Sequence, residues 1–389
     1  MNQGESSISM LMTKVENNGA ERQNIGLYKK VHPYRLGELF CGPGGIALGA
    51  LNAKLTHNDE LYKIEHVWAT DYDKDTCDTY IKNICPDNPD TVFCKDVRKL
   101  NLLSMPKIDA FAYGFPCNDF SIVGEKRGVY GEFGPLYLYG VKIINHFKPK
   151  FFIAENVGGI TSANEGMAFK QILKDLESSG NGYNLTVNLY KFEEYGIPQA
   201  RHRVIIVGMD KNLGSNFKVP KPTTPDNPIT CKNAIEMPRI PPTAPNQERT
   251  SQSRIVEERL KLIQPGENVW NAQLPQHLKL NVKGAKLSQI YKRLHPMKPA
   301  YTITGSGGGG THVYHWEEPR ALTNRERARL QTFPDTYEFC GSKESVRKQI
   351  GMAVSPKMAE ILFNSILKML AGKEYKSTAP SWTFQESLF

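Results

Sequence analysis

The sequence predicts an α/β fold with a mostly parallel sheet and a second, smaller domain, and three observations lead to this prediction. From Arg35 onward, short β-branched or aromatic runs alternate with longer amphipathic stretches, which is the pattern of βαβ units. After Met209 this alternation stops and closely spaced prolines appear. A chain of 389 residues, 40% of them hydrophobic, is long enough to form a full core and a further domain.

The expected elements of the first domain follow in order along the chain. Residues 1–32 are polar and predict a flexible leader. Over residues 33–211, strands are expected at Leu36–Phe40, His66–Thr70, Thr91–Phe93, Ile108–Tyr113, Phe151–Ala154, Leu185–Tyr190 and Val204–Gly208. Helices are expected at Ile46–Ala53, Lys74–Asn83, Leu136–His146 and Met167–Ser178.

The second domain is predicted over residues 212–320, which are basic and interrupted by prolines. Its stretch Lys279–Lys298 carries several Lys and Arg residues and no acid, which favours a nucleic-acid contact over an ordinary solvated face. Gly305–Gly310 is expected to act as a flexible hinge.

The C-terminal part of the chain, residues 321–375, is predicted to return to the first domain. Thr323 and Glu326 have the spacing of a capping box, and a last amphipathic helix is expected over Pro356–Leu370. Residues 376–389 form a tail.

Composition narrows the classes of function. Lys and Arg (49) exceed Asp and Glu (40), and the formal net charge of +9 favours a polyanionic partner such as nucleic acid. No apolar run approaches the roughly 20 residues of a membrane helix, and no signal peptide is expected. The seven cysteines are odd in number, and Cys77, Cys85 and Cys94 lack the paired spacing of zinc sites, so reduced thiols, no metal and a cytoplasmic protein are expected.

A glycine-rich turn, Glu38–Gly45, joins the first expected strand to a helix. Glycines at the carboxyl end of a first strand let the backbone approach a ligand, although a tight turn alone can also require them. Asp71 and Asp96 end the next two strands, where acids hold the hydroxyls of nucleosides. The spacing differs from Gly-x-Gly-x-x-Gly, which disfavours a dinucleotide and suits a nucleoside without phosphates, such as S-adenosylmethionine.

Two further segments follow strand ends. Cys117 lies in a proline-containing loop, Tyr113–Ser121, where an exposed thiol could act as a thiolate nucleophile; the alternative is a small buried hydrophobe. Glu155 emerges from an apolar strand, which can raise its pKa enough for proton donation near neutral pH, although such a residue can also cap a turn.

The segment Gln199-Ala-Arg201-His-Arg203 enters the last expected strand of the first domain. Because residues two apart on a strand share a face, Gln199, Arg201 and Arg203 are expected to converge on an anion or a base edge, with His202 pointing away. A solvated basic strand entry is the alternative.

In this order, these segments resemble the DNA (cytosine-5) methyltransferase family. The resemblance continues through Arg293–Thr304, Leu322–Asp335 and Gln349–Val354, and it covers residues 35–209 and 290–372. It implies a Rossmann-like, seven-stranded, mostly parallel sheet of the class I methyltransferases in a catalytic and cofactor-binding domain. It also implies that residues 212–320 form a target-recognition domain and hinge, with duplex DNA lying between the domains.

The resemblance also implies roles for individual residues. Cys117 is expected to attack C6 of a flipped-out cytosine, Glu155 to hold the N3 edge, and Arg203, with Arg201, to assist near the base. Contacts with S-adenosylmethionine are expected from Phe40, Gly42, Gly44, Gly45, Asp71, Tyr72, Asp96, Val97, Met352 and Ala353. Contacts with DNA are expected from Asn118, Ser121, Gln199 and Arg293.

Three positions depart from the family pattern. The family usually has Asp at Glu38, Gln at Asn118 and Asn at Met352. Asn118 is one methylene shorter, so its contacts with DNA can differ, and Met352 cannot make the polar contact of an Asn. Neither change touches the nucleophile or its acid, so activity is still expected.

The resemblance and the size of the chain suggest a monomeric bacterial modification enzyme, cytoplasmic and associated with the nucleoid through DNA. It would be paired in function with a restriction endonuclease, without a physical complex and without a membrane. Three alternatives remain: an RNA cytosine methyltransferase on the same scaffold, a binding module without catalysis, and a nicotinamide-dependent oxidoreductase. The size of the middle region argues against an RNA methyltransferase. The presence of Cys117, Glu155 and Arg203 argues against a binding module, and the glycine spacing argues against an oxidoreductase.

Overall fold

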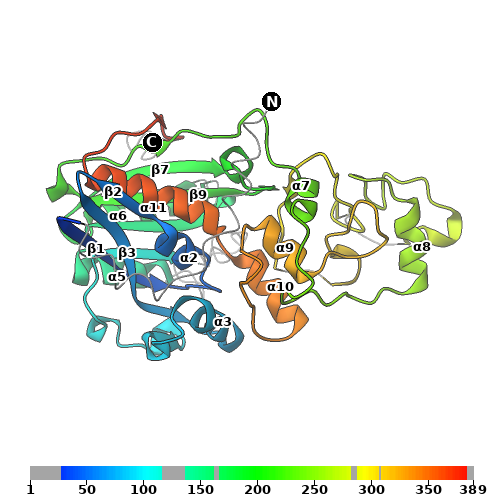
Figure 1. Cartoon of the computed structure of the whole chain (residues 1–389), viewed down its shortest axis with the longest axis horizontal. Coiled ribbons are helices and arrows are strands. Elements are labelled where there is room, and N and C mark those ends of the chain that lie inside the picture. Colours follow the sequence, from blue (N-terminus) through cyan, green and yellow to red (C-terminus); the bar gives the residue numbers. More distant parts are fainter. Residues whose placement is uncertain (1–27, 116–135, 162–165, 282–286, 306–307, 383–389) are drawn as a thin grey trace. The chain divides into compact units, whose positions relative to one another are not determined.

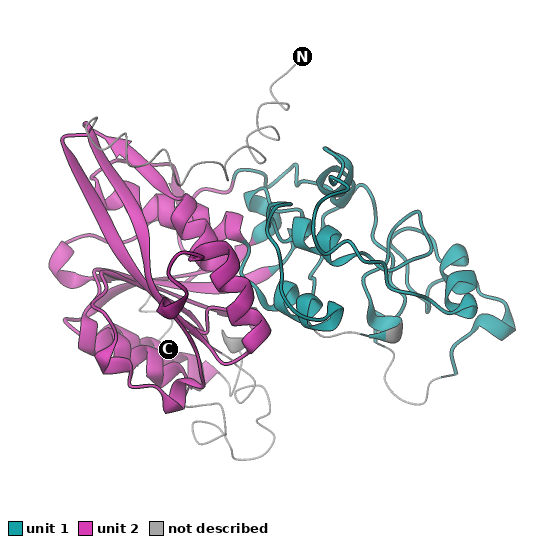
Figure 2. Ribbon diagram, turned by 60° about the horizontal axis from the view of Figure 1, so that its bottom comes forward, with its two compact units in different colours: residues 1–16, 192–201, 223–355 teal, residues 17–191, 202–222, 356–389 magenta. Residues whose placement is uncertain are grey.

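The structure is a computed structural model that describes residues 28–115, 136–161, 166–281, 287–305 and 308–382 (Figure 1). The chain divides into two compact units (Figure 2). The described part of unit 1 lies within Phe192–Arg201 and Thr223–Ser355, and that of unit 2 within Asn17–Lys191, His202–Pro222 and Pro356–Phe389. Unit 2 is therefore assembled from segments that lie on both sides of unit 1 in the sequence.

Unit 2 is built on one sheet in the strand order β2-β3-β1-β5-β6-β9-β7, with β4 also paired to β3. The strands run parallel except at two places, where β9 lies antiparallel between β6 and β7 and where β2 is antiparallel to β3. The bounds are β1 Lys30–Leu39, β2 Lys54–His57, β3 Glu60–Asp71, β4 Val92–Cys94, β5 Ala110–Gly114, β6 Phe151–Val157, β7 Tyr183–Lys191 and β9 His202–Asp210. The predicted mostly parallel α/β sheet is confirmed.

All strands predicted for the first domain are present, and β2 is an addition that the sequence did not indicate. Its hairpin with β3 turns at Asn58 and Asp59, which have φ values of 51° and 61°. Positive φ at both central residues is typical of a type I′ turn, whose twist matches that of the flanking strands. Asn and Asp tolerate this conformation better than other non-glycine residues.

Five helices in the described part of unit 2 cover its sheet (Figure 1). They are α2 Gly45–Asn52, α3 Lys74–Ile84, α5 Leu136–Phe147, α6 Met167–Ser178 and α11 Pro356–Leu370, in close agreement with the prediction. Helices α2 and α11 pack together, and Gly49 makes this possible because a Cβ there would overlap Pro356 O and Ala359 Cβ. The main core lies between the sheet and α5 and α6, around Phe111, Phe152, Ile143, Ile172 and Leu173.

Short elements complete unit 2. Its single-turn 3-10 helices are η3 Pro89–Thr91, η4 Val97–Lys99, η5 Leu102–Ser104, η6 Gly158–Thr161 and η9 Lys211–Leu213. A two-stranded sheet pairs β10 (Val219–Pro220) with β12 (Ser377–Thr378). Among the helices of the described residues, none is long and apolar enough to cross a membrane.

Unit 1 has little regular structure. Its elements are η8 Phe192–Tyr195, β8 Gln199–Ala200, α7 Cys231–Glu236, α8 Arg254–Leu262, η10 Gln276–Leu278, β11 Ala300–Tyr301, η11 Gly309–Thr311, α9 Asn324–Leu330 and α10 Lys343–Met352. Strands β8 and β11 form a parallel pair. Two hydrophobic clusters hold the unit, one around Leu294, Ile303 and Leu330 and the other around Leu260 and Tyr314.

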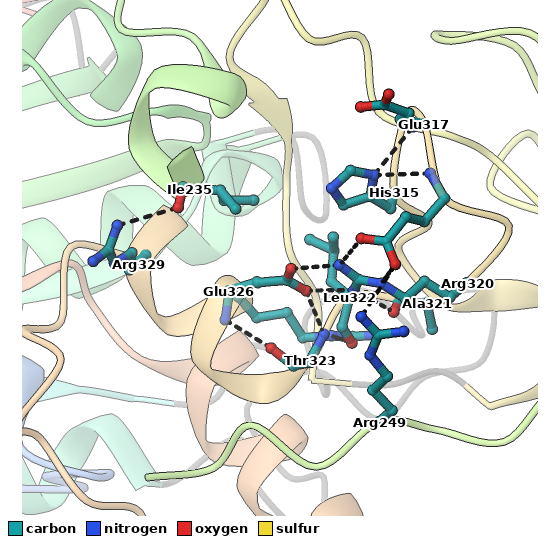
Figure 3. A network of polar contacts seen from close by, with 12 residues as sticks. Ile235, Arg249, His315, Glu317, Arg320, Ala321, Leu322, Thr323, Glu326 and Arg329 are labelled. Carbon is teal, nitrogen blue, oxygen red and sulfur yellow. Dashed lines mark hydrogen bonds and ion pairs between the residues drawn. The ribbon is translucent and has the colours of Figure 1, made fainter. Parts of the chain in front are cut away.

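The start of α9 confirms the predicted capping box. Glu326 N donates to Thr323 Oγ1 (3.2 Å), and Thr323 N donates to Glu326 Oε2 (2.7 Å). The same Glu326 carboxylate is bonded to Arg320, which also pairs with Glu318 (Figure 3). Burial, the largest single effect, lowers the pKa of Arg320, but the bonds to Glu326 and Glu318 outweigh it and raise that pKa.

Candidate functional site

The glycine-rich turn after β1 has a backbone conformation that few residues adopt. Phe40, Gly42 and Gly44 have φ values of 54°, 55° and 90°. A positive φ is strained for phenylalanine and free of strain for glycine. Nothing lies within 4 Å of a Cβ built on Gly42, so the turn leaves open space on that side. A ligand can therefore approach the backbone closely here.

Asp71, at the end of β3, fixes this turn. Its Oδ2 accepts a hydrogen bond from Gly42 N (3.1 Å), and its Oδ1 accepts one from Asp73 N (3.1 Å). Burial raises the pKa of Asp71, while the backbone N–H groups act in the opposite direction. The next residue, Tyr72, exposes its ring to solvent. A carboxylate, an open glycine turn and an exposed aromatic ring together suit the sugar and base of a nucleoside.

The other two residues expected on this side are differently placed. Asp96 caps η4 and forms an ion pair with Arg98 (2.6 Å), and the bonds from the Arg98 side chain and then its backbone lower the pKa of Asp96. Val97 is buried in the main core. The carboxylate of Asp96 thus already has a strong partner, and its contact with a nucleoside stays a prediction.

Glu38 lies buried in β1, just before the turn. Tyr80 Oη donates to its Oε2 at 3.4 Å, while Oε1 has no hydrogen-bond partner among the described residues. Burial raises the pKa of Glu38 well above its usual range; the bond from Tyr80 lowers it, and the charge of Asp71 raises it further. Within the part of the chain that the structure describes, Glu38 is therefore a buried acid without a cation.

Glu155 and Arg203 are brought together by the antiparallel pairing of β6 and β9. Arg203 stands opposite Val157, so its side chain reaches Glu155 diagonally on the same face. Arg203 Nε lies 3.0 Å from Glu155 Oε1, and the two side chains are only 13% and 14% exposed. In the parallel pairing with β5, Glu155 faces Gly114, where a Cβ would come within 3.2 Å of Glu155 Oε2. The predicted acid and arginine thus form one shielded pair.

Asn156 anchors Phe115, directly after the end of β5. Its Nδ2 donates to Phe115 O (3.0 Å), and its Oδ1 accepts from Val157 N (2.8 Å). The side chain is buried. No role was assigned to Asn156 from the sequence, although its position directly after Glu155 could have marked it as part of the site. Cys117, Asn118 and Ser121 lie outside the described residues.

Gln199 and Arg201 belong to unit 1 and are buried there. Gln199 donates to Leu330 O (3.3 Å) and accepts from Ile303 N (2.9 Å). Arg201 donates to Ile303 O (3.2 Å) and Ala353 O (3.0 Å). These bonds hold backbone segments together, and the expected contacts of Gln199 with DNA and of Arg201 with the base stay predictions.

The remaining expected residues also lie in unit 1. Arg293 is buried and donates to His315 O, Leu260 O and Ile263 O at 2.8, 2.8 and 2.9 Å. Met352 is exposed at the end of α10, and Ala353 follows as its cap. Within the residues that the structure describes, no group of three or more His, Cys, Asp or Glu side chains could hold a metal ion.

Comparison with known proteins identifies the family of the chain. The profile of the family described as C-5 cytosine-specific DNA methylase matches residues 34–368. Type II methyltransferase M.BbvI of Brevibacillus brevis is 57% identical over 359 residues, which cover 90% of this chain and 96% of that protein. Type II methyltransferase M.NgoFVII of Neisseria gonorrhoeae is 41% identical, covering 86% of each chain.

A solved structure shows the same fold. It is the crystal structure of a proposed DNA modification methyltransferase encoded within an E. coli prophage, with a TM-score of 0.66 and 23% identity, covering 87% of this chain and 99% of that one. The family profile extends over most of the chain and includes the glycine turn, Glu155 and Arg203. The chain therefore belongs to the C-5 cytosine-specific DNA methylase family and is a DNA cytosine-5 methyltransferase.

Proposed function

We propose that the chain methylates C5 of a cytosine in a specific duplex DNA sequence, through a covalent adduct between Cys117 and C6 of a base flipped out of the helix. The observation that carries this proposal is the shielded Glu155–Arg203 pair beside Asn156, whose side chain fixes Phe115 two residues before Cys117. Glu155 and Phe115, which precedes Cys117 by two residues, thus lie at the ends of neighbouring strands, β6 and β5, at the same edge of the sheet.

The residues divide the chemistry as follows. The Cys117 thiolate adds to C6, and the electron pair of the C5–C6 double bond becomes available at C5. Glu155 holds the N3 edge of the ring and stabilises the adduct by proton donation, while Arg203 keeps Glu155 in place and assists near the base. After methylation, loss of the C5 proton restores the double bond and expels Cys117 Sγ. Flipping is required because C5 and C6 are inaccessible within the base stack.

The nucleoside site described above suits S-adenosylmethionine, which supplies the methyl group when bound. Phe40, Gly42, Gly44 and Gly45 would border its methionine part, and Asp71 and Tyr72 its ribose and adenine. The open space at Gly42 and the exposed ring of Tyr72 support this assignment. Asp96, Val97, Met352 and Ala353 are proposed as further contacts.

The relatives that are named Type II methyltransferases support a role in restriction–modification. We propose that methylation protects bacterial host DNA from a functionally paired restriction endonuclease, without a physical complex. The enzyme would act as a monomer in the cytoplasm, bound to the nucleoid through DNA. Asn118, Ser121, Gln199 and Arg293 are proposed contacts with duplex DNA.

The test is transfer of a labelled methyl group to unmethylated duplex DNA, with RNA as a competing substrate and Cys117→Ser as the inactive control. Label at 5-methylcytosine, absent with Cys117→Ser, supports the proposal. A duplex containing 5-fluorocytosine at the target should also trap a covalent complex, because fluorine cannot leave as the C5 proton does. Label only in RNA would move the activity to RNA, and tight DNA binding without transfer would leave a binding module.

A further inference from the structure

Two arginines lie on packed helices of unit 1. Arg327 lies on α9 and is 2% exposed, and the side chain of Arg347 on α10 is 11% exposed. The two helices pack together, and Gln331 after α9 donates to Ile350 O on α10 (2.9 Å). Burying two guanidinium groups on packed helices is costly unless acids or other acceptors neutralise them.

The partners of these two arginines are weak. Arg327 donates to Leu322 O at 3.4 Å and contacts His312 Nδ1 at 3.3 Å, both longer than a usual hydrogen bond. Arg347 lies 3.4 Å from Glu344, whose side chain is 85% exposed. A pair with so exposed an acid contributes little. The buried Nε of Arg347 has no hydrogen-bond partner among the described residues.

Two other arginines of unit 1 are fully paired with carboxylates. Arg320 is bonded to both Glu318 and Glu326, and Arg329 forms a two-bond pair with Asp335. The acid nearest to Arg327 in sequence, Glu326, is therefore already engaged by Arg320. Within the described residues, no carboxylate lies at ion-pair distance from Arg327.

The electrostatics agree with the geometry. Burial and then the charge of Arg347 lower the pKa of Arg327 to about 10, so Arg327 stays charged at neutral pH. Burial and then the charges of Arg327 and Arg347 lower the pKa of His312 to about 4. His312 is therefore neutral at pH 7 and adds no third charge. Among the described residues, the acids near these two positive charges are the exposed Glu344 and Glu326, which Arg320 already binds.

We propose that Arg347 and Arg327 form a seat for a phosphate-class oxyanion, and that its occupant is a phosphodiester group of the DNA. An oxyanion would accept the hydrogen bond that Arg347 Nε lacks and would neutralise both guanidinium groups. The inference that DNA is the occupant rests on the proposed function, whereas the inference of an oxyanion site rests only on the arrangement of the side chains. Free inorganic phosphate has the same chemistry and serves as the probe.

The seat is tested first without DNA, by thermal unfolding of the full chain in chloride buffer with increasing inorganic phosphate. The melting temperature of the unaltered protein is expected to rise saturably with phosphate. Arg347→Gln removes one of two repelling charges, so without phosphate this variant should melt at the same or a higher temperature than the unaltered protein. Its melting temperature should rise much less when phosphate is added. The matched control is Arg254→Gln, an exposed arginine on α8 that pairs with Glu258.

The DNA assignment is tested by the affinity for unmethylated duplex at several salt concentrations. Arg347→Gln should weaken binding about tenfold and reduce the salt slope by about 1, as loss of one phosphate contact does. Arg347→Lys keeps the charge and should restore the salt slope. The affinity for S-adenosylmethionine should not change in either variant.

Each outcome decides one part of the proposal. A lower melting temperature of Arg347→Gln without phosphate, with an unchanged phosphate response, would show a structural role and overturn the seat. A lost phosphate response with unchanged DNA affinity would keep the seat and overturn DNA as its occupant. The phosphate experiment does not depend on methyl transfer, so it separates failure of the seat from failure of the proposed function.

Discussion

Buried arginines are held in different ways in the two units. In unit 2, Arg203 is bonded to the carboxylate of Glu155. In unit 1, Arg293 and Arg325 are held by backbone carbonyls, and Arg325 donates to Pro245 O, Pro334 O and Tyr337 O. A carboxylate neutralises a guanidinium group, whereas a carbonyl only orients it. Arg203 of unit 2 thus fixes an acid, whereas Arg293 and Arg325 of unit 1 join loops, although Arg320 and Arg329 of unit 1 also pair with carboxylates.

The largest expected effect comes from breaking the pair of unit 2. Glu155→Gln preserves the shape but removes the proton donor, so kcat for methyl transfer should fall about 10³-fold, or about 4 kcal/mol. Single-turnover methyl transfer measures the loss, and the affinity for S-adenosylmethionine is the control. Retention of more than a tenth of the activity would show that the pair has no part in the chemistry.

Removing an arginine of unit 1 should affect folding instead. Arg325→Met leaves three carbonyls without their donor, and the free energy of unfolding should fall by about 3 kcal/mol. Urea unfolding measures the change, with the exposed Arg239→Met as the matched control. If both variants unfold at the same urea concentration, carbonyl-bound arginines do not hold unit 1 together.

Glu38 of unit 2 is the opposite case to the buried arginines, because among the described residues it is a buried acid without a cation. Its pKa is raised in the folded protein, so the folded state keeps a proton that the unfolded state loses. Stability should therefore decline as pH rises above about 4, the usual carboxyl pKa of the unfolded chain. Glu38→Gln should lack this decline and gain on the unaltered protein between pH 5 and 8.

Denaturant midpoints at a series of pH values measure this difference, with the exposed Glu374→Gln as a control. Curves for Glu38→Gln and the unaltered protein that stay parallel throughout would show that Glu38 does not titrate with folding.

The smallest effect on stability is expected at the start of α9 in unit 1, where the carboxylate of Glu326 binds Arg320. Thr323→Ala removes one side of the capping box but leaves the Arg320–Glu326 pair, so the free energy of unfolding should fall by only about 1 kcal/mol. Urea unfolding checks the value. A loss as large as that of Arg325→Met would mean that the cap, and not the ion pair, fixes the start of α9.

Most of the fold of unit 2 was predictable because its strands and helices have clear periods and glycine or proline boundaries. Strand β2 was missed because Lys54–His57 is short and partly polar, and its turn has no glycine. Residues 321–355 pack within unit 1, whereas the sequence predicted that residues 321–375 return to the first domain. The functional domain boundaries stay a prediction, since packing units need not coincide with functional domains.

The candidate site was predictable where a motif lies at a strand end. Glu155 and Arg203, both expected near the base, form an ion pair, and Asp71, expected to bind a ribose, accepts a hydrogen bond from Gly42 N; their expected roles stay predictions. Alternation along Gln199–Arg203 did not reveal that Gln199 and Arg201 are buried, because burial depends on carbonyls far along the chain, at Ile303, Leu330 and Ala353. Likewise, the spacing of residues in the sequence did not show that Arg98 forms an ion pair with Asp96.

The contact between α2 and α11 has a consequence for biosynthesis. Helix α2 begins directly after the glycine turn, but its partner α11 is synthesised only after the whole of unit 1. The packing that supports the glycine turn therefore cannot form during translation of the first half of the chain, and nascent unit 2 keeps the face of α2 that packs on α11 uncovered for most of that time. A nascent chain stalled or cut before Pro356 should be a substrate for chaperones and proteases before it can bind its cofactor.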